Sequence, residues 1–249
     1  GDTVLYRALR KALPEAHLQV RFHNCFYRIL ERVKILGMHP PLKYRQLMSS
    51  MARLERLIFS DRNMTPVFLC KEDQDFYESL TGRADSLLWS VQVDLAERPS
   101  NPPDSEIRYL VYFGSVDTHK KDSIDFFISK VYPGLKKHFP ELEFKLYGSG
   151  TEHYQMPEKG IAGHGRYHGS DFPHAQDGLY LNPDLTGGGV KIKVKYYFEN
   201  NLRFLTTPYG FEGYSRDLVD KVYCWMEPMR AWEKTIEQIL VASQKENPN

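Results

Sequence analysis

Hydrophobic and polar residues form two kinds of pattern along residues 1–92. Apolar residues recur every three or four positions, which predicts amphipathic helices at residues 4–12, 26–33, 47–58 and from Lys71 onward. Between them lie short runs rich in β-branched and aromatic residues, which predict strands at 17–22, 65–70 and 87–91. Helices and strands that alternate in this way are typical of a parallel α/β layer.

This pattern stops at residues 93–106, where prolines and small polar residues replace the apolar periodicity. We therefore predict an interdomain linker at 93–106, between a partial N-terminal α/β domain (1–92) and a second α/β domain (107–225). The second domain has predicted strands at 107–113, 142–147, 160–165, 179–181, 202–206 and 219–223. Within 226–249, apolar residues from Met229 to Leu240 recur at helical spacing and predict a terminal helix.

Two strands of the second domain end in glycine turns, at Gly114-Ser115 and at Gly148. Glycine lets a backbone approach a ligand without a Cβ in the way, and ligands bind at the carboxyl ends of parallel strands. We expect these turns to lie on one edge of the sheet and to contact a ligand.

A third glycine turn follows the strand at 179–181 and precedes a predicted helix at 190–200. The turn consists of Thr186, Gly187, Gly188 and Gly189. Two lysines, Lys191 and Lys193, follow in the first turn of the predicted helix. Unpaired N–H groups and the helix dipole favour an anion there, which predicts a phosphate-binding turn. A flexible turn with solvated lysines remains an alternative. The turn is neither a P-loop nor a dinucleotide fingerprint.

The segment PDLTGGGVKIKVKYYFENNLRFLTTPYGFEGY resembles the donor-binding signature of group 1 glycosyltransferases of the GT-B fold. The resemblance extends upstream through YLVYFGSVDTHKKDSIDFF, FPELEFKLYGSG and GHGRYHG, and covers about residues 107–214. It implies a GT-B-like α/β fold with a Rossmann-like parallel sheet in the C-terminal domain. It also implies that the terminal helix packs back on the N-terminal part, which would be the second half of an acceptor-side domain.

The resemblance assigns roles to further residues. The turn with Arg166, Tyr167 and His168 would hold the nucleotide base, and Glu212 would lie near the donor. His23, at the end of the strand at 17–22, would contact the transferred sugar; a structural role in capping the next helix is the other interpretation. One departure concerns two glutamates of the family, whose positions Gly188 and Tyr196 occupy here.

Composition and charge limit the partners and the cellular compartment that we expect for the protein. A net charge of +1 gives no general attraction to nucleic acid. Three distant cysteines favour a reducing, cytoplasmic compartment over a disulfide framework. His164, His168 and His174 lack partners at metal-ligand spacing, so we predict no metal. Nine basic residues against three acidic ones between residues 21 and 62 suggest contact with an anionic inner membrane face; a solvated helix face is the alternative. No sequence run predicts a membrane span.

We therefore expect a metal-independent enzyme of polysaccharide biosynthesis, a hexosyltransferase that moves a sugar from a nucleotide diphosphate sugar to a glycan or lipid-linked acceptor. A non-catalytic nucleotide-sugar-binding module is the main alternative, and a GT-B isomerase a third. The start at Gly1-Asp2 suggests a fragment that lacks about the first third of its parent; a naturally short relative is the other interpretation.

Overall fold

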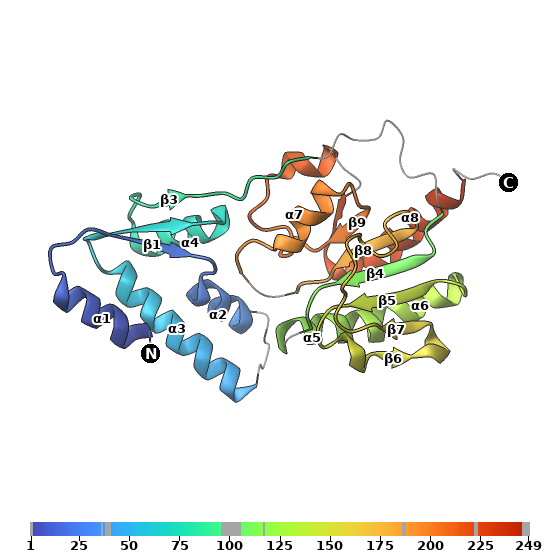
Figure 1. The fold of residues 1–249 in the computed structure, drawn as a ribbon, viewed down its shortest axis with the longest axis horizontal. Coiled ribbons are helices and arrows are strands. Elements are labelled where there is room, and N and C mark those ends of the chain that lie inside the picture. Colours follow the sequence, from blue (N-terminus) through green and yellow to red (C-terminus); the bar gives the residue numbers. More distant parts are fainter. Residues whose placement is uncertain are drawn as a thin grey trace. The chain divides into compact units, whose positions relative to one another are not determined.

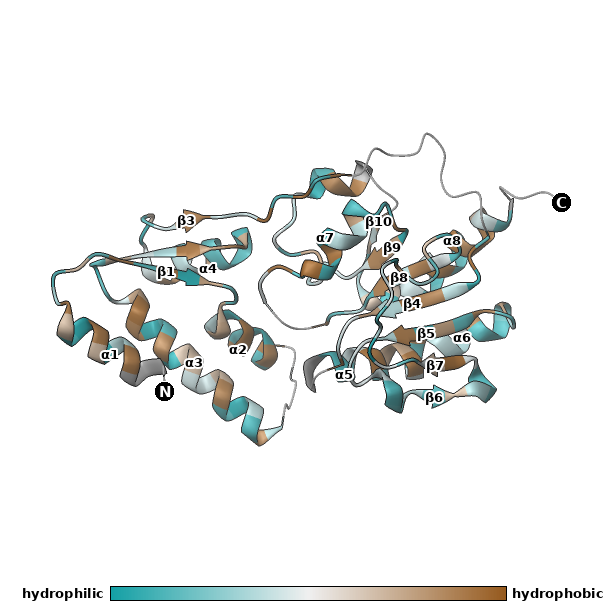
Figure 2. Cartoon of the chain, in the orientation of Figure 1, coloured by the Kyte–Doolittle hydropathy of each residue, from teal (hydrophilic) through white to brown (hydrophobic). Residues whose placement is uncertain are grey.

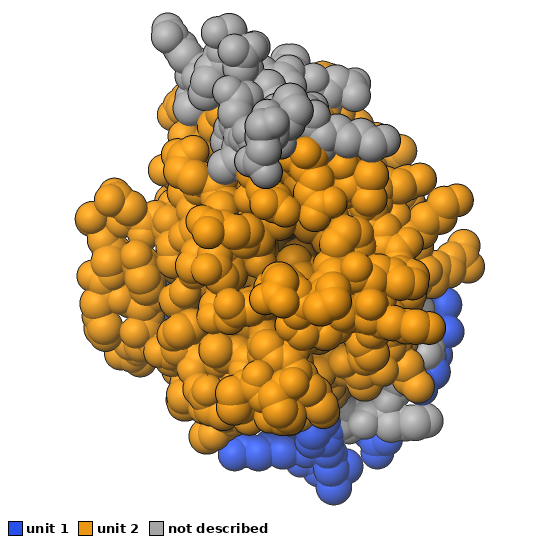
Figure 3. Space-filling view, turned by 90° about the vertical axis from the view of Figure 1, so that its right-hand side faces the viewer, with its two compact units in different colours: residues 1–91, 186–190, 212–214 blue, residues 92–185, 191–211, 215–249 orange. Residues whose placement is uncertain are grey.

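The computed structural model describes residues 2–35, 37, 41–95, 106–116, 118–185, 188–221 and 224–245. The chain forms two compact units. Unit 1 comprises Gly1–Val91 together with two short later segments, Thr186–Val190 and Glu212–Tyr214. Unit 2 comprises Gln92–Leu185, Lys191–Phe211 and Ser215–Asn249, and Figure 3 colours the two units separately. Most of the predicted linker, residues 96–105, lies outside the described residues.

Unit 1 is a small parallel α/β layer (Figure 1). In chain order its elements are α1 (Asp2–Ala12), β1 (Leu18–Phe22), α2 (Phe26–Ile35), α3 (Leu42–Phe59), β2 (Met64–Phe68), α4 (Lys71–Thr81) and β3 (Leu87–Leu88). The described strands pair in the order β1-β2-β3, all parallel. The apolar positions that predicted α3 supply part of the core, where Phe59 packs with Phe22, Phe68 and Tyr77. Hydrophobic and hydrophilic positions alternate along α1 and α3 (Figure 2).

Unit 2 holds a larger sheet (Figure 1). Its strands are β4 (Tyr109–Phe113), β5 (Glu143–Tyr147), β6 (Gln155–Met156), β7 (Ile161–Gly163), β8 (Gly178–Asn182), β9 (Phe204–Thr206) and β10 (Cys224–Met226). Within the described chain their order is β10-β9-β8-β4-β5-β7-β6, and all pairs are parallel except β6 with β7. From β4 the chain moves outward through β5 and β7, then crosses to the other side through β8, β9 and β10. This is the doubly wound Rossmann order, with its switch point between β4 and β8.

The helices of unit 2 are α5 (Thr118–Phe126), continued by a π-helical turn (Phe127–Val131) into α6 (Tyr132–His138), then α7 (Ile192–Glu199) and α8 (Trp232–Lys245). Buried side chains of β4 and β5, including Leu110 and Phe144, pack in one core cluster with α6 and α8. Because parallel strands bury both faces, Tyr180 and Leu181 are both fully buried although they point to opposite faces.

One expectation was wrong at the C-terminal end. The segment 219–223, predicted as a strand, begins within a 3-10 helix at Arg216–Lys221, and the strand follows at β10. Within unit 2, Trp232 and Ile236 of α8 are fully buried in the core, where Trp232 contacts Phe127 edge to face. The packing of the terminal helix on the N-terminal part stays a prediction.

Candidate functional site

The glycine turns after β4 and β5 lie against each other in unit 2. The Gly114 amide donates to the Tyr147 carbonyl oxygen at 2.8 Å, and the Gly148 amide donates to the Gly165 carbonyl oxygen at 2.7 Å. Gly114 and Gly148 have φ of +148° and +133°, and a Cβ on Gly148 would lie 2.1 Å from the Gly114 carbonyl oxygen. Only glycine permits this contact. The expected backbone edge therefore exists, with exposed Ser115 beside it.

Lys193 of α7 reaches the same edge. A Cβ on Gly114 would lie 3.9 Å from the Lys193 Cδ, and the Lys193 Nζ lies 4.8 Å from the centroid of the Tyr112 ring. The same Nζ is 3.8 Å from an oxygen of Asp184, which follows β8. Residues from β4, β8 and α7 thus meet at the switch point, the place where doubly wound sheets bind ligands.

Lys191 occupies a different place from Lys193. It is the N-cap residue of α7, because the helix begins at Ile192 and not at residue 190. Its side chain is half-buried. A contact with the Gly114 turn is thus shown for Lys193, and the role of Lys191 stays a prediction.

The predicted base-binding turn follows β7. Tyr167 packs edge-on against Phe113 and Tyr147, and its hydroxyl donates to the Asp171 carbonyl oxygen at 2.8 Å. Arg166 and His168 are exposed beside it. An aromatic surface next to exposed polar groups suits a planar nucleobase.

Two histidines of this region are part of the same aromatic cluster. His164 stacks on Tyr147 at a centroid distance of 4.6 Å, and His174 hydrogen-bonds the Tyr147 hydroxyl at 3.0 Å. Burial, and then the positive charge of Lys145, lowers the pKa of His164, and burial also lowers the pKa of His174. Both rings are therefore mostly neutral near pH 7.

The third glycine turn is packed within unit 1. A Cβ on Gly189 would lie 2.1 Å from the His23 carbonyl oxygen, and one on Gly188 would lie 2.9 Å from the Ile29 side chain. Close approach of the chain to itself is thus a sufficient reason for both glycines. Thr186 and Gly187 lie outside the described residues.

His23 is exposed at the carboxyl end of β1, where its ring nitrogen lies 3.4 Å from the Arg21 guanidinium. It does not cap α2. Glu55 of α3 caps α2, because its carboxylate accepts hydrogen bonds from the backbone amides of Phe26 and Tyr27, each at 2.7 Å. Burial raises the pKa of Glu55 to about 7, although these hydrogen bonds oppose the rise.

Glu212 is buried in unit 1, where Arg28 and Arg32 of α2 bind it. Each arginine donates to one carboxylate oxygen at 2.6 Å and to the other at 3.2 Å. Four donors occupy the four acceptor positions of the carboxylate. Arg28 and Arg32 had been counted in the basic surface of residues 21–62, and burial in these ion pairs removes them from it.

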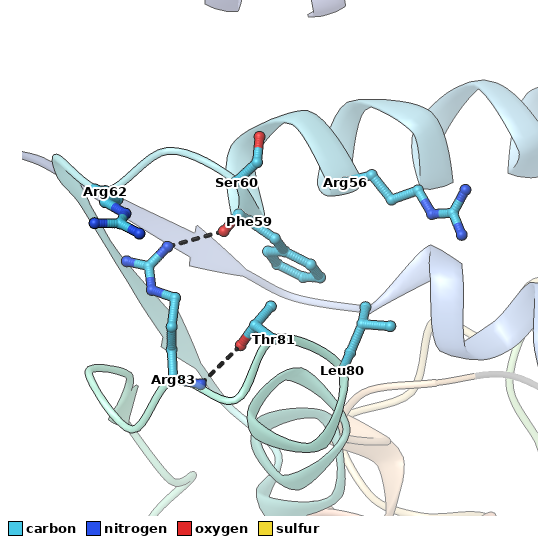
Figure 4. Close-up of a pocket in the computed structure, with 7 residues that line it drawn as sticks. All are labelled: Arg56, Phe59, Ser60, Arg62, Leu80, Thr81 and Arg83. Carbon is cyan, nitrogen blue, oxygen red and sulfur yellow. Dashed lines mark hydrogen bonds between the residues drawn. The ribbon is translucent and has the colours of Figure 1, made fainter.

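A pocket of about 330 Å³ lies elsewhere in unit 1 (Figure 4). Its lining includes Arg56, Arg62 and Arg83. Arg83 donates to the carbonyl oxygens of Phe59 and Met64 at 2.8 and 3.0 Å, so it caps the end of α3. This pocket lies near the start of β2, whereas His23 follows the end of β1. The pocket is therefore at the opposite edge of the parallel sheet from His23 and is not part of the candidate site.

No protein-family model and no curated protein sequence matches the chain. Two solved structures resemble this chain in fold. TarM superposes with a TM-score of 0.59 at 14% identity over 78% of this chain and 40% of TarM. WaaG, a glycosyltransferase involved in lipopolysaccharide biosynthesis, gives 0.58 at 13% identity over 97% of this chain and 75% of WaaG. The chain thus spans less than half of the length of TarM.

These likenesses show the fold. The chain has the GT-B glycosyltransferase fold, with mixed α/β units and parallel sheets, as the sequence predicted. Among the helices that the structure describes, none has the length and apolar character needed to cross a bilayer.

Sequence reasoning missed the partners of the charged groups. Arg28 and Arg32 are four residues apart, the spacing that puts two side chains on one helix face, and this was the available signal for a shared carboxylate. Asp184 had a weaker signal, its place directly after a buried strand and Pro183.

Proposed function

We propose that the protein is a glycosyltransferase that uses a nucleotide diphosphate sugar as donor. The observation that carries this proposal is the switch point of unit 2, where the Gly114 and Gly148 turns and the Lys193 side chain lie together at the carboxyl ends of the strands. A backbone edge without Cβ atoms, next to an ammonium group, suits a diphosphate.

The reaction breaks the bond between the sugar and a nucleoside diphosphate. Negative charge develops on the departing diphosphate, and the Lys193 ammonium group stabilises it without a metal ion. Tyr167 and Arg166 hold the nucleobase by stacking and polar contact. His23, exposed after β1, is the unit 1 residue that we assign to the transferred sugar.

Lys191, Gly188, Gly189 and Glu212 have less direct roles in this proposal. Lys191 adds positive charge at the start of α7. Gly188 and Gly189 shape the turn that precedes it, and Glu212 fixes the segment Glu212–Tyr214 to α2 within unit 1.

The acceptor is a glycan or a lipid-linked saccharide, and the enzyme acts in the cytoplasm on polysaccharide biosynthesis. Peripheral membrane contact is consistent with the surface of α2 and α3. Ile35, Leu42 and Leu47 are 83%, 61% and 54% exposed. Exposed Lys43 and Arg45 accompany them, and basic groups beside apolar ones favour an anionic interface.

Flotation with vesicles tests this contact. The protein should bind phosphatidylserine-containing vesicles better than neutral ones, and a Lys43→Glu/Arg45→Glu variant should lose the difference. Equal binding to both vesicle types by the unaltered protein would remove the membrane from the proposal.

Substitution of Lys193 tests the transferase site. Lys193→Ala should lower kcat/KM for sugar transfer about a hundredfold, the size expected for loss of one preorganised donor to a developing charge. Lys195→Ala is the matched control, because Lys195 lies on the same helix and pairs with Glu199. The measurement is transfer of radiolabelled sugar from UDP-, GDP- and ADP-sugars. Unchanged turnover in Lys193→Ala would contradict the proposal.

A nucleotide-sugar-binding module without transferase activity is the second candidate. Exposed Tyr196 at a glutamate position, and a Glu212 carboxylate saturated by two arginines, favour it. Calorimetry with the same sugar nucleotides, next to the transfer assay, separates the two candidates. Binding without transfer to any acceptor in a panel of glycans and lipid-linked saccharides would support the module.

A further inference from the structure

Asp184 is a buried carboxylate at the switch point. It follows Pro183 at the carboxyl end of β8 and is 2% exposed. Neither carboxylate oxygen has a hydrogen-bond donor among the described residues. The Lys193 Nζ, at 3.8 Å, is close enough for an ion pair but too far for a hydrogen bond.

The surroundings fix the position of Asp184. The Thr207 hydroxyl donates to the Asp184 carbonyl oxygen, and the Gly210 amide donates to the Thr207 hydroxyl at 3.0 Å. Two residues before it, the Asn182 side-chain amide donates to Thr206 and Gly210, while its own Oδ1 is buried without a donor in the described chain. The segment after β9 thus holds the backbone and leaves acceptor oxygens unused.

A carboxylate buried without hydrogen bonds opposes folding, and an ion pair at 3.8 Å offsets little of that cost. Residues held in a state that is unfavourable for stability are concentrated at functional sites. A carboxylate that has acceptor capacity and no donor is suited to hydroxyl groups, which form strong hydrogen bonds with ionised acceptors.

We infer that Asp184 accepts hydrogen bonds from hydroxyl groups of the donor's sugar moieties, next to the diphosphate that Lys193 binds. The inference rests on the proposed function and deepens it, because it names the residue that reads the sugar part of the ligand. A carboxylate and an ammonium 3.8 Å apart recognise a ligand that carries a phosphate and a hydroxyl close together.

Asp184→Asn separates this role from a structural one. The variant keeps the shape of the side chain and removes its charge. Its affinity for UDP-glucose, GDP-mannose or ADP-glucose, whichever the unaltered protein binds, should fall about tenfold, the loss of one charge-assisted hydrogen bond. Its affinity for inorganic pyrophosphate should stay the same or rise, because a negative charge near Lys193 has gone. Calorimetry measures both.

Thermal unfolding gives the second readout. Removal of a poorly paired buried charge should leave the melting temperature of Asp184→Asn no lower than that of the unaltered protein. Asp122→Asn, an exposed substitution on α5, is the control and should change neither binding nor melting. A lower melting temperature in Asp184→Asn would show that the Lys193 ion pair is structural, and would overturn the inference.

The outcomes separate the inference from the function on which it rests. Equal sugar-nucleotide affinity in the unaltered protein and Asp184→Asn overturns the inference alone. An equal fractional loss of pyrophosphate and sugar-nucleotide affinity also overturns it, because Asp184 would then only orient Lys193. Absence of binding and transfer with every sugar nucleotide in the unaltered protein overturns the proposed function, and the inference with it.

Discussion

Glu212 and Asp184 are buried to a similar degree, 7% and 2% exposed, yet their surroundings are opposite. In unit 1, two guanidinium groups occupy every acceptor position of the Glu212 carboxylate. In unit 2, Asp184 has one ammonium group at 3.8 Å and no hydrogen-bond donor in the described chain. Burial by itself therefore does not distinguish a structural carboxylate from one that can bind a ligand; the number of occupied lone pairs does.

Glu212 is the glutamate of the segment FEGY, at residues 211–214, for which the sequence predicted a place near the donor. A saturated carboxylate has no acceptor position left for a sugar hydroxyl, so Glu212 holds its segment against α2. The unsaturated carboxylate lies instead at the switch point of the Rossmann sheet, beside the glycine turns. We therefore assign a stabilising role to Glu212 and propose the recognition role for Asp184.

The largest effect is expected from Glu212→Ala. It removes the carboxylate that Arg28 and Arg32 share, while Arg28 keeps its ion pair with Asp73 at 2.9 Å, and should lower the free energy of unfolding by about 3 kcal/mol. Urea unfolding measures the loss, and Glu158→Ala, an exposed carboxylate in unit 2, is the control. If Glu212→Ala unfolds like the unaltered protein but no longer binds sugar nucleotides, Glu212 and not Asp184 is the ligand-binding carboxylate.

Glu55 lies between Glu212 and Asp184 in the number of hydrogen bonds that its carboxylate accepts. Two backbone amides donate to it, yet burial raises its pKa to about 7 from an ordinary 4.5. The folded state therefore binds more protons than the unfolded state between pH 4.5 and 7. The stabilising contribution is complete below pH 4.5 and is lost as the pH rises to 7, by at most about 3 kcal/mol.

The difference in unfolding free energy between the unaltered protein and Glu55→Gln, measured across this range, isolates the effect from the other titrating groups. A difference that does not vary with pH would show that the hydrogen bonds of Glu55 fully offset its burial.

The smallest effect is expected from an exposed ion pair. Lys121 and Asp125 form an i,i+4 pair on α5 with side chains 61% and 43% exposed. Lys121→Ala should change the free energy of unfolding by less than about 0.5 kcal/mol, because water screens the pair. A change above about 1 kcal/mol in urea unfolding would mean that exposure is a poor guide to the strength of the charged pairs in this protein.

The sequence predicted the strand and helix alternation well where the elements were long and periodic. It failed where local pattern and tertiary packing differ. Residues 219–221, predicted as the start of a strand, belong to a 3-10 helix instead, and residues 222–223 lie outside the described part of the chain. At the candidate site, the glycine turns follow strand ends and Lys193 lies in the first turn of a helix, both of which local sequence pattern predicts; their role in binding stays a prediction.

By itself, the sequence determined the α/β class, the glycine turns at the strand ends and the resemblance to the GT-B fold, because periodicity and turn chemistry act between residues close together in the chain. Only the tertiary structure decided which charges are satisfied. Arg28 and Glu212 are 184 positions apart, and Asp184 lacks a donor in the described chain although Lys193 is nine positions away. Hydrogen-bond satisfaction depends on atoms brought within about 3 Å by folding, and these atoms come from residues far apart in the sequence.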